Sequence, residues 1–298
     1  HVNNALCVWN IRNRNRQVIE LINLKKFKNK KIKYSFIQGR LSSEVAGKFQ
    51  HFPIHNWEKE FHLARKLGFD SVEWIISDLS NPIFNPLFSK IIKKVLIKNK
   101  IRISSISMDL IMDNPLHKIT KKESLWLSDK VKEAVNYFKI NRVSIPIEER
   151  SRYNNKFEKS LALKNLQLIY SKLNSSCKVC IETDMSPKSL ISLFKMKKFD
   201  KLGVLLDLGN TRAHGFNIED YFKFYPEKIY SIHIKYREES YGMTKILIKK
   251  NFHELNFLTN NLKKLKNLND ISFQTYKTHK KFFTDMQKSI KNYNTYVK

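Results

Sequence analysis

Three side chains that could bind a divalent cation stand near the ends of three successive β-rich runs. Glu182 lies in KVCIET, Asp207 in GVLLDL and His233 in IYSIHIK. Two carboxylates and a neutral imidazole that converge within a few ångströms would repel without a cation, and their oxygen and nitrogen atoms suit Mn, Mg, Co or Zn. The pattern therefore predicts a divalent metal site. A salt-bridged polar layer at the same place is the alternative.

Asp207 poses the sharpest question, because it stands in a run with the composition of a buried strand. Val204, Leu205 and Leu206 precede it and Leu208 follows. An unpaired charge out of water costs several kcal/mol, so this carboxylate needs a partner. Gly209 and Asn210 are expected to turn the chain tightly out of the strand.

The elements that must position these residues alternate between strands and helices. From about residue 33 onward, eight β-rich runs are each followed by an amphipathic helical stretch. The runs are KYSFIQ, DSVEWI, IRISSIS, NRVSIPI, KVCIET, GVLLDL, IYSIHIK and DISFQT. Alternation implies parallel pairing, and eight such units close into a (β/α)₈ TIM barrel. The first run leads into QGRLSSEVAGK, which lacks the glycine spacing typical of an open doubly wound sheet.

The chain is expected to form one large domain. We predict a barrel domain over residues 32–298, preceded by an N-terminal extension, residues 1–31, whose role the sequence does not indicate. A length of 298 residues is common for a single α/β barrel.

The active site of such a barrel forms at the carboxyl ends of its strands. We expect the side chains at this rim to contact a substrate, namely Gln38, Arg40, Glu73, Asp109, Asn210 and Lys235. A helix cap or surface carboxylate is the alternative for Glu73 and Asp109, and also for Glu148 at the fourth strand end. A surface cation is the alternative for Arg40 and Lys235.

The formal net charge of +29 would ordinarily suggest nucleic acid or an anionic membrane as a partner. The excess is mainly lysine and is scattered along the chain, which favours a solvated surface and makes a nucleic-acid partner unlikely on this pattern. No apolar run approaches the roughly 20 residues of a membrane span, and the start has no signal-peptide core. We therefore expect a cytoplasmic protein without a membrane partner.

Several segments, taken together, resemble a known family. They are IQGRLSS, KFQHFPIHNWEKEFHLARKLGFDSVEWI, ISSISMDLIMD, IETDM, LDLGN, HIK and FQT, spread between Ile32 and Lys277. They are similar to the sugar phosphate isomerase/epimerase family of xylose isomerase-like TIM barrels, which is related to tagatose epimerase and endonuclease IV. The resemblance is greatest to members encoded with bacterial surface-polysaccharide genes.

The resemblance implies a metal held by Glu182, Asp207, His233 and Gln274. It implies a small sugar or sugar phosphate as substrate, with Glu182 as the catalytic base that removes a proton next to a carbonyl. The divalent metal would stabilise the resulting enediolate.

Departures from the family pattern keep other functions open. Gln274 stands where epimerases carry a second carboxylate, which argues against two-carboxylate epimerisation, does not imply inactivity and leaves the choice between isomerase and epimerase open. Tyr236 stands where the family usually has an acidic residue, the following loop KILIKKNFHEL has lysines in place of glycine, and Lys277 stands where arginine is common. These last changes make a catalytically degenerate barrel that acts as a binding protein the main alternative. An endonuclease IV-like DNA repair enzyme is less favoured, because Asn210 replaces a histidine of that relative.

Overall fold

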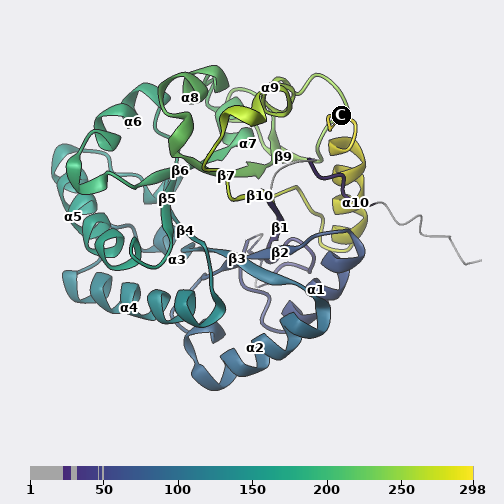
Figure 1. Ribbon diagram of the computed structural model, residues 1–298, viewed down its shortest axis with the longest axis horizontal. Helices are drawn as coiled ribbons and strands as arrows, with labels where there is room; N and C mark the ends of the chain where they lie inside the picture. The colour runs from purple at the N-terminus through teal and green to yellow at the C-terminus, as the bar shows by residue number, and fades with distance from the viewer. Residues whose placement is uncertain (1–22, 28–31, 46, 49, 298) are drawn as a thin grey trace, which may run out of the picture.

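The computed structural model describes residues 23–27, 32–45, 47–48 and 50–297. In this part of the chain eight parallel strands close into a barrel in the order β1-β10-β7-β6-β5-β4-β3-β2, and helices surround them (Figure 1). The barrel strands are β1 (Lys33–Ile37), β2 (Ser71–Ile75), β3 (Arg102–Ser107), β4 (Arg142–Ile147), β5 (Lys178–Thr183), β6 (Gly203–Asp207), β7 (Ile229–Ile234) and β10 (Asp270–Phe273). The predicted (β/α)₈ barrel is confirmed.

The helices fall where amphipathic stretches were expected, with two short additions. The α-helices are α1 (Trp57–Lys66), α2 (Pro86–Asn99), α3 (Leu110–Asp113), α4 (Lys121–Phe138), α5 (Lys156–Leu173), α6 (Pro187–Phe194), α7 (Leu208–Ala213), α8 (Ile218–Phe224), α9 (His253–Asn261) and α10 (Phe282–Tyr293). Short 3₁₀ turns cover Pro82–Phe84, Glu149–Ser151, Lys197–Phe199, Pro226–Lys228 and Leu262–Lys264. No described helix is both long and apolar enough to cross a bilayer.

Local sequence explains where several helices begin and end. α4 starts with a capping box, in which Thr120 Oγ1 accepts from the Glu123 amide at 3.2 Å and Glu123 accepts from the Thr120 amide at 2.7 Å. Ser186 caps α6, and Pro187 occupies its first turn. α1 ends just before Gly68, whose φ of +85° is the left-handed conformation that glycine adopts without strain.

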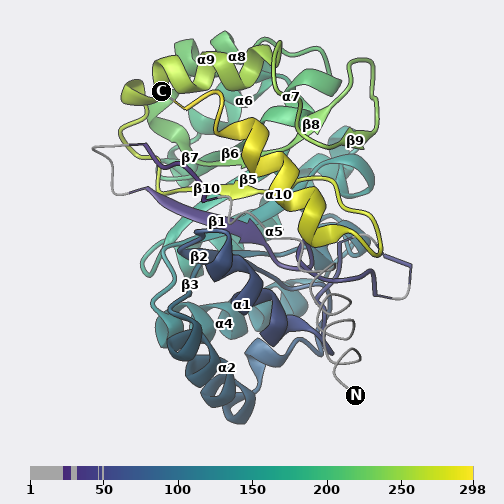
Figure 2. The same cartoon turned by 90° about the vertical axis from the view of Figure 1, so that its right-hand side faces the viewer.

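The barrel interior is polar and its outer face is apolar. β1 and β10, far apart in the sequence, lie side by side and close the barrel (Figure 2). Because side chains alternate along each strand, one set points to the surrounding helices and forms the large apolar core. The other set points inward and is rich in serine and charged residues, as the buried Ser35–Ser272 and Arg142–Asp270 contacts show. Inward-facing barrel layers more often consist of branched apolar residues.

The turn after β1 is tied down from two sides. Gly39 has a φ of +88°, and a Cβ there would lie 2.8 Å from the His51 carbonyl oxygen. Glu60 on α1 accepts from the amides of Gly39 at 3.0 Å and Leu41 at 2.9 Å, and burial raises the pKa of this carboxyl to about 7. Lys277 donates to the Gly39 carbonyl at 2.6 Å. These contacts hold the segment that carries Gln38 and Arg40.

The region after β6 differs from the expected tight turn. α7 starts at Leu208, directly after β6, so Gly209 and Asn210 lie in a helix. The expectation of a turn was wrong because the Asp207 side chain caps the helix and lets it begin without a connecting loop. After β7, a small hairpin pairs β8 (Tyr236–Arg237) with β9 (Thr244–Lys245). Of the expected N-terminal extension, residues 1–22 and 28–31 lie outside the described part of the chain.

Candidate metal centre

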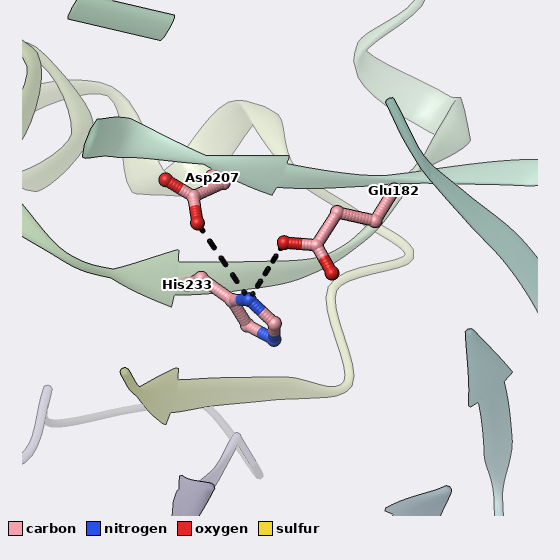
Figure 3. Close-up of side chains that lie close together, drawn as sticks. All are labelled: Glu182, Asp207 and His233. Atoms are coloured by element: carbon pink, nitrogen blue, oxygen red, sulfur yellow. Dashed lines mark hydrogen bonds and ion pairs between the residues drawn. The ribbon is translucent and has the colours of Figure 1, made fainter. Parts of the chain in front are cut away.

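Glu182, Asp207 and His233 point toward one another from three neighbouring strands, β5, β6 and β7 (Figure 3). His233 Nδ1 lies 3.2 Å from Glu182 Oε1 and 3.8 Å from Asp207 Oδ2. One donor atom from each residue lies within 4.8 Å of the other two, and all three side chains are buried. The pattern of three strand ends thus predicted a real convergence of metal-binding groups.

The two oxygens of Asp207 have different partners. Oδ1 accepts from the Asn210 amide at 2.7 Å and thereby caps α7. Oδ2 lies 2.8 Å from the Lys235 ammonium and faces His233 Nδ1. The carboxylate at the end of the buried run therefore has a helix amide on one side and a cation on the other.

The donor set fits a divalent cation. Carboxylate oxygens and an imidazole nitrogen suit Zn, Mn, Co and Mg to different degrees. Gln274 directly follows β10, the strand beside β7, and its Oε1 is buried without a hydrogen-bond partner while its Nε2 donates to Gln50 at 2.9 Å. An acceptor oxygen left unpaired at this position is available as a fourth ligand. Within the described residues, Glu182, Asp207 and His233 form the only group of three or more His, Cys, Asp or Glu side chains whose ligand atoms lie close enough to share a metal ion.

The charge on His233 is set by its carboxylate neighbours. Burial by itself would lower the pKa of this imidazole, but Glu182 and Glu73 outweigh burial and raise the pKa to about 10. Without a metal the ring therefore carries two N–H groups, and these point at Glu182 and Glu73. A cation that bound Nδ1 would displace the proton there.

Arg40 and Asp109 meet through a residue that the sequence did not single out. Gln50 accepts a short hydrogen bond from Arg40 and donates to Asp109 Oδ2 at 2.7 Å. Burial lowers the pKa of Arg40 to about 10, while the carboxylates of Asp109, Asp207 and Glu182 act against this decrease. The positive charge of Arg40 therefore interacts with Glu182 and Asp207, two of the candidate metal ligands. Gln50 lies in an irregular loop, where no periodicity marks a residue as inward-facing.

A second set of hydrogen bonds links residues that follow β4, β6 and β7, at the carboxyl ends of the strands, which we call the mouth of the barrel. Asn210 donates to Glu148 Oε2 at 2.9 Å and accepts from Arg237 at 2.8 Å. Burial, and after it the charges of Glu182 and Asp207, raise the pKa of Glu148 well above its ordinary value. Glu148 stands directly after β4, so its position at a strand end was the available signal.

Two predicted substrate contacts have other surroundings. Gln38 is fully buried, with Oε1 3.4 Å from the Ile75 amide and Nε2 without a hydrogen-bond partner. Glu73 is the third of five residues in β2 and is not at the rim. It lies at the Nε2 side of His233, whereas Nδ1 faces Glu182 and Asp207. Its carboxylate therefore contacts the Nε2 side of the imidazole and not the Nδ1 side that faces Glu182 and Asp207.

The fold is that of a (β/α)₈ TIM barrel, and solved structures of xylose isomerase-like barrels are similar to it. A D-psicose 3-epimerase from Clostridium cellulolyticum H10, solved with D-tagatose, superposes with a TM-score of 0.65 at 10% identity over 90% of this chain and 100% of that one. An IolI protein with a bound zinc atom gives a TM-score of 0.64 at 13% identity, over 89% and 96% of the two chains.

A third structure, a xylose isomerase-like TIM barrel protein from Mycobacterium smegmatis in complex with magnesium, gives a TM-score of 0.62 at 15% identity over 90% and 97%. At the level of sequence, no family model and no curated protein matches this chain. The likeness is therefore one of fold.

Proposed function

We propose that this protein is a metal-dependent isomerase or epimerase of a sugar or sugar phosphate and belongs to the xylose isomerase-like family. The observation that carries the proposal is the convergence of Glu182, Asp207 and the Nδ1 atom of His233 at the carboxyl ends of adjacent strands. Solved barrels of the same fold contain zinc or magnesium, and one of them holds a ketose.

The proposed ligands are Glu182, Asp207, His233 and Gln274. A divalent cation held there would act as a Lewis acid toward the oxygens of a bound sugar. Glu182 would use one carboxylate oxygen as ligand and the other as the base that takes a proton from carbon next to the carbonyl.

The rim would hold the substrate in place. Arg40 and Lys235 bring positive charge to the same mouth, where it would attract a phosphate or the developing negative charge of the substrate. Asp109 and Asn210 are fixed by Gln50 and by Glu148 and Arg237. Their preorganised polar groups would contact sugar hydroxyls.

The test has a metal step and a chemical step. Wild-type protein and Asp207→Ala are dialysed against mixed divalent ions, and the metal content is measured by mass spectrometry. We expect about one metal per chain in the wild type and its loss in the variant. The metal-loaded wild type is then incubated with ketoses, aldoses and their phosphates in D₂O, where NMR should show deuterium replacing the proton next to the carbonyl. Glu182→Gln should abolish this exchange.

A binding protein is the second candidate, and one contact favours it. The Lys235 ammonium, 2.8 Å from Asp207 Oδ2, neutralises a ligand carboxylate without any metal. A wild-type protein that takes up no divalent ion and exchanges no substrate proton would overturn the enzyme proposal, and measured binding of a sugar without metal would support this candidate.

A further inference from the structure

The two nitrogens of His233 face different carboxylates. Nδ1 lies toward Glu182 and Asp207, the proposed metal ligands, and Nε2 lies 3.2 Å from Glu73 Oε2. A histidine that binds a metal through one nitrogen keeps a proton on the other, and the acceptor of that proton decides which nitrogen is free to bind. In this barrel the acceptor position is filled by Glu73.

Glu73 is fixed more firmly than a surface carboxylate. Its Oε2 accepts from Arg142 at 2.8 Å and from Ser272 at 2.7 Å, and its Oε1 accepts from Ser144 at 3.2 Å. These side chains come from β2, β4 and β10 and are fully buried. The carboxylate therefore has no room to rotate away from the ring.

Arg142 is fixed in turn by a second carboxylate. Its Nε and Nη2 donate to the two oxygens of Asp270, each at 3.0 Å, and Ser231 donates a further short hydrogen bond to Asp270. The guanidinium thus lies between Glu73 and Asp270, and its charge keeps Glu73 an acceptor for the His233 N–H. The arrangement extends from the amino ends of β4 and β10 up to the imidazole.

We propose that Glu73 is a positioning residue that directs Nδ1 of His233 to the metal by accepting the proton of Nε2, with Arg142 holding Glu73 in place. The inference rests on the proposed metal site and concerns how that site is assembled. Carboxylates in this position also make the imidazole a stronger ligand. Glu73 acts through His233 and touches neither metal nor substrate.

The test compares two isosteric variants that both remove a carboxylate from Arg142. Glu73→Gln replaces the charged acceptor of the His233 Nε2 proton with a neutral amide, whereas Asp270→Asn leaves the Glu73–His233 contact intact. The affinity for Zn²⁺ is measured by competition with a chelator, and stability by urea unfolding of the metal-free proteins. We expect Glu73→Gln to bind Zn²⁺ about 10- to 100-fold more weakly. Asp270→Asn should lose stability but keep an affinity close to wild type.

Each outcome is decisive for the inference. Equal weakening in both variants would mean that the network supports the fold and not the ligand, and an unchanged affinity in Glu73→Gln would also overturn the positioning role. In both cases the metal site of the wild type stands. A wild type that binds no Zn²⁺ would overturn the proposed function together with this inference.

A spectroscopic measurement on the wild type needs no variant to fold. In protein labelled with ¹⁵N at histidine and loaded with Zn²⁺, we expect His233 to show a protonated Nε2 with a slowly exchanging proton and a metal-shifted Nδ1. The reverse pattern, with Nε2 bound to the metal, would overturn the proposal.

Discussion

Two layers of the barrel differ in how their carboxylates are paired. On the Nε2 side of His233, toward the amino ends of the strands, two buried carboxylates share the guanidinium of Arg142. On the Nδ1 side, toward the carboxyl ends, carboxylates surround the imidazole of His233 itself. Glu73 and Asp270 both pair with Arg142 at 2.8–3.0 Å. Glu182 and Asp207 approach His233, and Glu148 lies close enough for its pKa to be raised by both of them. The carboxylate oxygens of the interior layer all have hydrogen-bond partners, whereas polar groups at the strand ends do not.

Unpaired polar atoms show the same difference. Directly after β1 and β10, Gln38 Nε2 and Gln274 Oε1 are buried without hydrogen-bond partners. In the interior, the oxygens of Glu73 and Asp270 are all engaged. Unmatched groups cost stability in the absence of a ligand and are retained where a ligand completes them. The contrast separates a stabilising layer from a binding layer within one barrel.

The largest expected effect comes from breaking the matched layer. Arg142→Met would leave Glu73 and Asp270 buried without their cation, and we expect the free energy of unfolding to fall by about 3–5 kcal/mol. Urea denaturation of the metal-free protein measures this. Lys172→Met is the control, because Lys172 forms a half-exposed pair with Asp129 and should change stability by less than about 1 kcal/mol. Equal effects in the two variants would remove the distinction between the layers.

The second prediction concerns the proton on His233. Since Glu182 and Glu73 raise its pKa to about 10, a metal must displace a proton from Nδ1 at neutral pH. Metal affinity should therefore increase about 100-fold between pH 6 and pH 8, and calorimetry in buffers of different ionisation enthalpy should detect the released proton. An affinity independent of pH over this range would contradict the binding of the metal to His233.

The same raised pKa also affects folding. In the metal-free protein His233 contributes stability that is fully present below the unfolded pKa of about 6.5 and is lost as the pH rises toward 10.

The smallest expected effect is a gain in the free energy of unfolding when Glu148, a carboxylate of the mouth, is replaced. The folded-state pKa of Glu148 is raised, so the unfolded chain loses this proton at lower pH than the native protein and stability falls as the pH increases. Glu148→Gln keeps an acceptor for Asn210 and removes the titration. We expect a gain on the order of 1 kcal/mol at pH 8 that vanishes below pH 4, measured by urea denaturation at both values. A loss of stability at pH 8 would show that Glu148 is compensated in the mouth.

Much of the fold could be predicted because its signals are local. All eight barrel strands lie within the expected runs, since alternating β-rich and amphipathic stretches determine the order of elements. The ligand candidates Glu182, Asp207 and His233 could be found because they stand near strand ends. The helix that begins at Leu208 was missed because the apolar run continues past Asp207 and no glycine or proline separates strand from helix.

The depth of a side chain inside the barrel could not be predicted in this way. Glu73 was expected at the rim, but Trp74 and Ile75 continue β2 beyond it, and the pairing of β2 with β3 shifts register between Val72 and Glu73. Depth depends on strand stagger, which is a property of the closed sheet. The ion pairs of Arg142 could not be predicted from the sequence either, because only the three-dimensional fold brings this residue between carboxylates from β2 and β10.

Asp207 has a consequence for how readily the centre can assemble. One of its oxygens is committed to the first turn of α7, while the other faces His233. The side chain is therefore already confined to one rotamer when the chain folds. An arriving ion would not have to immobilise it, so the loss of torsional freedom occurs once in the life of the molecule and not at every binding event.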